Sequence, residues 1–140
     1  MRKRWRVLRY EKASAAYNMA LDEAIAEAVA FRVAGPTIRF YGWEPAAVSI
    51  GRFQKLEEVV DLEGCERHGV DVVRRSTGGG AVFHDQEITY SVICPEDMMP
   101  ADVNMAYQEI GGWIVNALKL IGIEGTFEPI NDVLVNGKKI

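Results

Sequence analysis

Two long stretches of the chain repeat apolar residues at the spacing of an α-helix. The first runs from Ala15 to Val33, directly after Ser14, a residue type that commonly caps a helix N-terminus. Its expected apolar face is Leu21, Ala24, Ile25, Ala28 and Val29, with Asp22, Glu23 and Glu27 off that face. The second covers residues 102–122, with an expected inner face of Ala106, Ile110, Ile114, Ala117, Leu118 and Ile121. Gly35-Pro36 is expected to stop the first helix.

Shorter runs, rich in β-branched and aromatic residues, are typical of strands. The expected strands are RVLRY (6–10), TIRFYGW (37–43), AVSIG (47–51), VDVVRR (70–75), AVFHD (81–85), EITYSVI (87–93) and DVLV (132–135). Asn136-Gly137 predicts a type I′ hairpin turn, after which KKI begins the return strand. Residues 61–68 are expected to form a short helix that Gly69 ends. This order predicts an α+β arrangement rather than a regular βαβ alternation.

Composition narrows the class of protein. The chain has 140 residues, enough for one domain, with 49% apolar and 26% charged residues, as in a globular protein. Its net charge of −4 argues against general nucleic-acid binding, and no apolar run is long enough to cross a bilayer. Cys65 and Cys94 are too few for a disulfide framework, and the basic first residues lack the apolar segment of a signal peptide. We therefore expect a cytoplasmic protein that binds neither nucleic acid nor membranes.

The stretch RRSTGGGAVFHD at residues 74–85 carries the clearest chemistry. Three consecutive glycines allow a loop whose backbone N–H groups point at one place and let a ligand come close. Arg74 and Arg75 precede them, and an arginine fork suits a phosphate or a carboxylate. The pattern fits neither the Walker loop nor the dinucleotide-binding fingerprint. The residues alone therefore indicate a site for an anionic ligand, or else a hairpin connection flanked by solvated arginines.

Four stretches together resemble the lipoate–protein ligase A family. They are NMALDEA (18–24), IRFYGWEPAAVSIGRFQ (38–54), RRSTGGGAVFHD (74–85) and NDVLVNGKKI (131–140), in the order and at the spacings of that family. The resemblance covers the chain but only about the first half of the family's catalytic domain. The family's lysine segment continues into a Ser-Gly-x-Ala-Gln run, whereas this sequence ends at Ile140. We therefore expect a single domain over residues 1–140 whose C-terminal part is missing.

The resemblance implies a fold and an activity. The fold is that of biotin/lipoate protein ligases, related to class II aminoacyl-tRNA synthetases, with a mixed, largely antiparallel sheet flanked by helices. Lipoate and ATP with Mg²⁺ would form lipoyl-AMP, and the lipoyl group would pass to a lysine. The implied acceptors are lipoyl domains of 2-oxoacid dehydrogenase E2 subunits or the glycine cleavage H protein. In some relatives a separate accessory domain or chain takes part.

The resemblance also implies a role for nine residues. Arg75 would lie near the carboxylate and phosphate of lipoyl-AMP, and His84 would line its pocket. Lys139 would be the catalytic cation that contacts the carbonyl and α-phosphate oxygens. The loop residues that would lie along the intermediate are Thr77, Gly78, Gly79 and Gly80. Asn131 and Asp132 would face the nucleotide, with Asp132 also a candidate Mg²⁺ ligand.

Two other functions stay open at this point. Octanoyltransferases of the same fold move an octanoyl group from acyl carrier protein to a lipoyl domain through a cysteine thioester. In them the cysteine precedes the lysine segment, but residues 125–139 contain no cysteine, so the sequence favours the ligase. The chain could also be a non-catalytic half that needs a partner, and we then expect very little ligase activity from it alone.

Overall fold

The structure is a computed structural model that describes residues 4–140, and the chain divides into two compact units. Unit 1 ends at Cys94, and unit 2 is Pro95–Ile140. The described part of unit 1 contains, in chain order, β1 (Arg6–Ala13), α1 (Ala15–Ala30), β2 (Thr37–Trp43), β3 (Ala47–Ile50), α2 (Leu56–Val59), α3 (Leu62–His68), β4 (Asp71–Arg74), β5 (Val82–His84) and β6 (Thr89–Ile93). Unit 2 contains a 3-10 helix (Glu96–Met98), α4 (Val103–Leu120), β7 (Gly125–Glu128), β8 (Asp132–Val135) and β9 (Lys138–Lys139).

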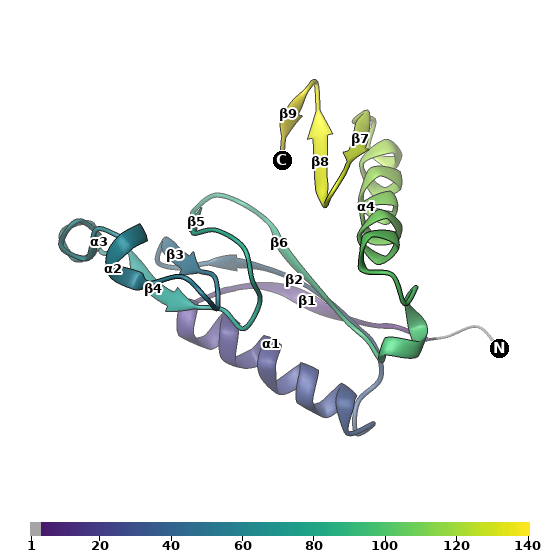
Figure 1. Ribbon diagram of the computed structural model, residues 1–140, viewed down its shortest axis with the longest axis horizontal. Coiled ribbons are helices and arrows are strands. Elements are labelled where there is room, and N and C mark those ends of the chain that lie inside the picture. The colour runs from purple at the N-terminus through teal and green to yellow at the C-terminus, as the bar shows by residue number, and fades with distance from the viewer. Residues whose placement is uncertain (1–3) are drawn as a thin grey trace. The chain divides into compact units, whose positions relative to one another are not determined.

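Unit 1 is built from two three-stranded sheets in the orders β1-β2-β6 and β4-β3-β5. In each sheet the central strand has one parallel and one antiparallel neighbour. Helix α1 packs against strands of both sheets, and Figure 1 shows it lying along them. A small core forms there from Ala15, Tyr41, Trp43 and Ala47. The expected α+β class with mixed sheets is therefore confirmed.

Helix α1 begins as the sequence predicts but ends earlier. The Ser14 hydroxyl accepts a hydrogen bond from the Tyr17 N–H at 3.3 Å, as an N-cap does. The helix ends at Ala30 rather than Val33, because Arg32 takes a left-handed conformation with φ of 58°. The Val33 N–H then reaches back to the carbonyl of Ala28. Phe31 and Val33 continue the apolar spacing in sequence, but their side chains are exposed in this turn.

The face that α1 turns to the sheet is more polar than its sequence predicts. Ile25 and Val29 are buried as expected, whereas Ala24 is exposed and Asn18 is fully buried. Asp22, expected off the apolar face, lies on the inner face, because β2 and β6 bring it hydrogen-bond donors. A periodicity argument cannot find these donors, since they come from residues far along the chain.

One of those donors is a buried cation, Arg39, whose exposed fraction is 1%. Its guanidinium donates to the side chain and backbone carbonyl of Asn18 and pairs with Asp22 at 2.9 Å. It also lies 3.9 Å from the centre of the Tyr41 ring. The Tyr41 hydroxyl donates to Asp22 at 2.9 Å, and burial together with this carboxylate raises the pKa of Tyr41. Helix α1 is thus joined to β2 by a fully partnered polar cluster.

Unit 2 consists of one helix packed on an antiparallel sheet, β7-β8-β9. Asp102 caps α4 by accepting from the Met105 N–H at 3.0 Å, so the helix starts where expected. Gly111 is its buried residue, while Ala117 and Ile121, expected on the inner face, are exposed. A Cβ at Gly111 would overlap the Phe127 ring, so the helix lies very close to β7, a strand the sequence did not predict.

The expected hairpin of unit 2 is confirmed. Asn136 and Gly137 have φ of 51° and 73°, the two positive values that a type I′ turn needs. The turn pairs Val135 with Lys138 and Leu134 with Lys139. The return strand is therefore short but in register.

A close approach between two glycines shapes the end of β3. The carbonyl oxygen of Gly79 lies so near Gly51 that a Cβ at Gly51 would overlap it. The approach is fixed by the Arg52 N–H, which donates to the Thr77 carbonyl at 2.9 Å, and by the Arg75 N–H, which donates to the Ile50 carbonyl at 3.0 Å. Gly51 was not singled out in the sequence, yet it lets the glycine run lie against β3.

We predict that Asp22→Ala lowers the free energy of unfolding by about 3 kcal/mol, since it leaves the buried Arg39 guanidinium short of its carboxylate. Urea unfolding would measure this. Glu23→Ala is the matched control, because Glu23 is the exposed neighbour, and its effect should stay within about 0.5 kcal/mol. A loss below about 1 kcal/mol for Asp22→Ala would contradict the prediction.

A second prediction concerns Gly51→Ala, which should cost about 1–3 kcal/mol because the new methyl group meets the Gly79 carbonyl. Amide NMR signals of Gly78, Gly79 and Gly80 should move as the loop is displaced. Gly35→Ala is the control, because no atom lies within 4 Å of its Cβ position. Equal effects of the two changes would refute the close approach.

Candidate functional site

One face of the sheet β4-β3-β5 carries two polar side chains, Ser49 and His84, beside the core residue Ala47. Strands β3 and β5 are antiparallel, with Ala47 opposite His84 and Ser49 opposite Val82. Because side chains alternate along a strand, Ser49 and His84 share a face, and Val48 and Phe83 lie on the other. Arg75 donates to Ser49 and also to the carbonyls of Gly78 and Gly80, so it joins the glycine run to Ser49. The candidate site is therefore on this face.

His84 lies at the centre of a hydrogen-bonded chain and is only 7% exposed. Its Nδ1 lies 2.5 Å from the Glu87 carboxylate, and its Nε2 lies 2.7 Å from the Ser49 hydroxyl. A carboxylate only accepts, so Nδ1 carries the proton of that hydrogen bond. The ring also stacks on Trp43 at a centroid distance of 4.0 Å. Both ring nitrogens of His84 are thus hydrogen-bonded within unit 1.

The chain continues on both sides of His84. The Trp43 indole N–H donates to the Thr89 hydroxyl at 2.8 Å, and that hydroxyl donates to Glu87 at 2.7 Å. On the other side, Arg75 donates to the Ser49 hydroxyl at 3.1 Å. The carboxylate that His84 uses belongs to Glu87 rather than to Asp85, its neighbour in sequence. Ser49 could have been found as a polar residue on the inward side of a predicted strand.

Both arginines of the motif bind backbone carbonyls of this chain. Arg75 Nη1 donates to the Ser49 carbonyl at 3.1 Å, and Nη2 donates to the carbonyls of Gly78 and Gly80 at 2.8 Å each. Arg74 Nη1 donates to the carbonyls of Gly51, Arg52 and Gln54. Partial burial lowers the pKa of Arg75. The arginine forks expected from the sequence are present, and both are hydrogen-bonded to backbone carbonyls of this chain.

The glycine run itself is exposed, as a ligand-binding loop must be. Gly79 has φ of 96°, which requires glycine, and the Cβ positions of Gly78 and Gly80 face open space. Thr77 is also exposed, and its carbonyl anchors the loop to Arg52. The structure thus brings Arg75, Thr77, the glycine run and His84 together within unit 1.

The other three expected residues belong to unit 2. Lys139 Nζ lies 2.6 Å from the Asp132 carboxylate, between the neighbouring strands β9 and β8. The Lys139 side chain is 66% exposed, so the cation can reach a ligand, while Asp132 is 33% exposed. Asn131 is exposed in the turn before β8. The structure thus brings Lys139 and Asp132 together and leaves Asn131 beside them in sequence.

The described residues do not by themselves form a metal centre. Within residues 4–140 no three acidic, histidine or cysteine side chains gather as metal ligands would. The carboxylate of Asp132 is paired with Lys139. Asp132 alone therefore does not fit a Mg²⁺ site, and no chemical step is assigned to that ion. Helices long and apolar enough to cross a bilayer are likewise absent from residues 4–140.

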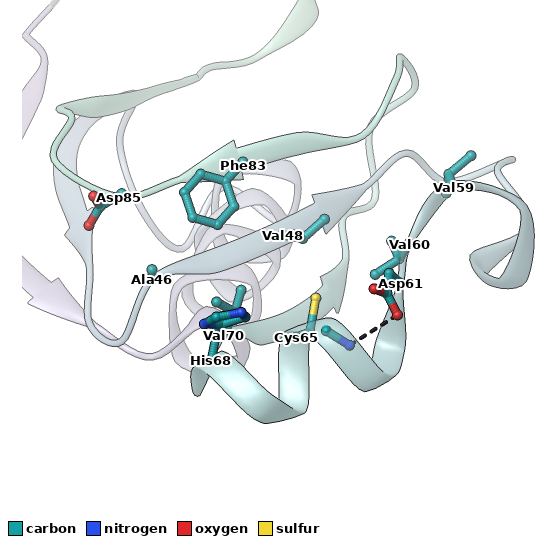
Figure 2. A pocket seen from close by; sticks show the side chains of 11 residues that line it. Ala46, Val48, Val59, Val60, Asp61, Cys65, His68, Val70, Phe83 and Asp85 are labelled. Carbon is teal, nitrogen blue, oxygen red and sulfur yellow. Dashed lines mark hydrogen bonds between the residues drawn. The ribbon is translucent and has the colours of Figure 1, made fainter.

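The opposite face of the same sheet borders an open cleft of about 600 Å³ (Figure 2). Val48 and Phe83 form its sheet side, and Cys65 and His68 of α3 line the helix side. Asp61 caps the N-terminus of α3 by accepting a hydrogen bond from the Gly64 N–H at 3.0 Å. Ser49 and His84 point to the other face, so this cleft is separate from the glycine run.

Comparison with known proteins agrees with this geometry. Residues 14–140 match the family model of the lipoyl protein ligase A/B catalytic domain. The chain is 48% identical over 122 residues to octanoyltransferase LipM of Clostridioides difficile, covering 86% of this chain and 45% of that protein. It is 42% identical over 125 residues to octanoyltransferase LipM of Bacillus subtilis, covering 88% of this chain and 45% of that protein. The chain therefore spans about half the length of the curated relatives it matches.

Solved structures show the same relationship. The bi-partite lipoate protein ligase of Thermoplasma acidophilum, described with its E2 lipoyl domain, matches with a TM-score of 0.79 and 32% identity, over 100% of this chain and 54% of that one. A lipoate-protein ligase A bound with ATP matches with a TM-score of 0.80 and 30% identity, over 100% of this chain and 59% of that one. With the family model and these relatives in agreement, the chain belongs to the lipoyl protein ligase A/B catalytic domain family.

Proposed function

We propose that this chain takes part in octanoyl transfer, moving an octanoyl group from a carrier thioester to a lysine of a lipoyl domain. The observation that carries this proposal is the identity of 42–48% to octanoyltransferases over at least 85% of the chain. The identity to lipoate ligases of known structure is lower, at 30–32%. The sequence alone favoured the ligase, whereas the similarity to these relatives favours the octanoyltransferase.

The reaction is an exchange at one carbonyl carbon. A nucleophile attacks the octanoyl thioester, the carbon–sulfur bond breaks, and the carrier thiol leaves with a proton. When the final nucleophile is the lysine amine, the amine loses that proton as the amide bond forms. The carbonyl oxygen gains negative charge in between, so the site must offer donors to it. The exposed glycine run and the exposed Lys139 ammonium are the groups of this chain that suit that task.

A cysteine intermediate on this chain would need Cys65 or Cys94, because residues 125–139 contain no cysteine. Both thiols are half-buried. Cys65 lines the cleft of Figure 2, on the face of the sheet away from the glycine run. Direct transfer to the acceptor lysine needs neither thiol. Mass spectrometry can therefore distinguish the two routes, because only the cysteine route adds an octanoyl group to this chain.

ATP-dependent lipoate ligation is the second candidate. It is favoured by the missing cysteine and by the Asn131-Asp132 pair, the features that resemble the ligases. In this reaction lipoate attacks the α-phosphate of ATP, pyrophosphate leaves, and lysine then displaces AMP from lipoyl-AMP. A ligase of similar structure was solved with ATP, and another with lipoic acid. The same lipoyl-domain acceptors serve both candidates, and the neighbour described with its E2 lipoyl domain suggests this class.

The donor decides between the candidates. We predict that the chain modifies a lipoyl domain when supplied with octanoyl carrier protein without ATP, and that lipoate with ATP gives no pyrophosphate exchange. Intact-mass spectrometry of the lipoyl domain measures the product. Cys65→Ser and Cys94→Ser identify the intermediate, because a thioester on one cysteine disappears only in its own variant. Lipoate-dependent pyrophosphate exchange without octanoyl transfer would replace the proposal by the ligase, and binding without either activity would leave a binding half.

Lys139 should be needed whichever donor is used. We predict that Lys139→Ala slows transfer by about a hundredfold, because it removes a cation beside the developing oxyanion. Lys138→Ala is the matched control, since Lys138 is the neighbouring exposed lysine of β9 on the opposite face, and its rate should stay within about twofold. Similar rates for both variants would exclude Lys139 from the chemistry.

A further inference from the structure

We infer that Arg75 is a positioning residue: it holds the glycine run so that the N–H groups of residues 79–81 face an oxygen of the acyl head group. This differs from direct binding of that oxygen by the guanidinium. The nature of the ligand, a carboxylate or thioester oxygen, rests on the proposed function. The geometry of the loop stands independently of it.

The guanidinium is already occupied by the protein. Its two Nη atoms make four hydrogen bonds, two to the carbonyl and hydroxyl of Ser49 and two to the carbonyls of Gly78 and Gly80. A ligand that bound these Nη groups would have to break contacts of 2.8–3.1 Å. Only the Nε–H of Arg75 remains. The side chain therefore acts mainly on its own loop.

The positions of the carbonyls fix the directions of the N–H groups. In a trans peptide the C=O and the following N–H point in opposite directions. The carbonyls of Gly78 and Gly80 point to Arg75, so the N–H groups of Gly79 and Ala81 point away from it. The Gly79 carbonyl points at Gly51, so the N–H of Gly80 points away from β3.

These three N–H groups have no protein acceptor within residues 4–140. They belong to exposed residues, so solvent or a ligand satisfies them. Successive free N–H groups of this kind attract anionic oxygens, and they suit an oxygen whose charge grows during reaction. The loop thus uses its carbonyls for anchoring and leaves its donors for the ligand.

Arginine is the residue type that this anchoring requires. Its planar fork reaches the carbonyls of Gly78 and Gly80 from one nitrogen and Ser49 from the other. A lysine keeps the charge but has one nitrogen, so it cannot hold both sides. Arg75→Lys therefore keeps the positive charge at this position but removes the hydrogen bonds that anchor the loop.

The first experiment measures the free chain, before any ligand is present. In the wild-type protein, ¹⁵N relaxation should give order parameters near 0.85 at Gly79 and Ala81, and Arg75→Lys should lower them below about 0.6. Arg67→Lys is the matched control, because Arg67 is an exposed arginine of α3 in the same unit. Unchanged order parameters in Arg75→Lys would overturn the inference, since a residue that only binds ligand leaves the free loop unaffected.

The second experiment titrates octanoate and follows the amide protons. Octanoate should shift the amides of Gly79, Gly80 and Ala81 downfield, whereas 1-octanol, which lacks the carboxylate, should leave them in place. Arg75→Lys should weaken octanoate by about tenfold, the effect of roughly one lost hydrogen bond. Added ethylguanidinium should restore part of the shift in Arg75→Ala. Absence of the shift in the wild type, or unchanged affinity in Arg75→Lys, would overturn the inference.

These readouts are independent of turnover. If the amide shifts appear and the octanoyl transfer assay fails, the positioning role holds and the proposed donor is wrong. If transfer occurs while the loop stays rigid in Arg75→Lys, the proposed function holds and the positioning role is wrong.

Discussion

The buried guanidinium of Arg39 sets the constraint on which unit 1 is built. A cation with 1% exposure needs its acceptors in place when the unit folds, and Asn18 and Asp22 supply them from α1. Helix α1 therefore has one position along β2 in which this charge is satisfied. The same helix packs beneath Trp43, whose ring supports His84. The position of the site therefore depends on the polar cluster around Arg39.

The candidate site also depends on a connected set of hydrogen bonds between side chains. Ser49 accepts from Arg75 and is hydrogen-bonded to His84, and His84 donates to Glu87. Each group has its partner, and the described residues include no buried side-chain nitrogen or oxygen without one. Such a chain orients the glycine run through Arg75 and holds His84 against Trp43. The backbone N–H groups of the glycine run stay exposed in unit 1, and the Lys139 cation is exposed in unit 2.

Local chemistry made much of the fold predictable. The strand bounds of TIRFYGW and DVLV, the cap at Ser14, the start of α4 and the turn at Asn136-Gly137 all follow from neighbouring residues. Strand β7 was missed because GTFE is short and carries no clear alternation. The burial of Asp22 and the close approach of Gly51 were missed because their partners lie at least 17 positions away. Contacts between residues far apart along the chain produce no periodic pattern in the sequence.

For the site, the sequence identified residue types better than roles. The glycine run and His84 do lie together, but the arginines, expected to face the ligand, are hydrogen-bonded to backbone carbonyls. An arginine fork suits any planar pair of acceptors, and a strained glycine loop offers its own carbonyls at shorter range than a ligand. The motif therefore encodes a loop whose carbonyls are held by its own arginine and whose glycines stay exposed.

The shared loop also explains why relatedness and chemistry point to different donors. An octanoyl thioester and a lipoyl adenylate both present an acyl carbonyl, so residues 74–85 can serve either. What differs is the leaving group: a thiol sulfur is bonded to the acyl carbon in one case, and a phosphate oxygen of AMP in the other. Residues that distinguish them must lie where the leaving group departs. Residues 125–139 contain no cysteine, and Lys139 within them is paired to Asp132. The glycine motif that identifies the family therefore does not by itself decide the donor.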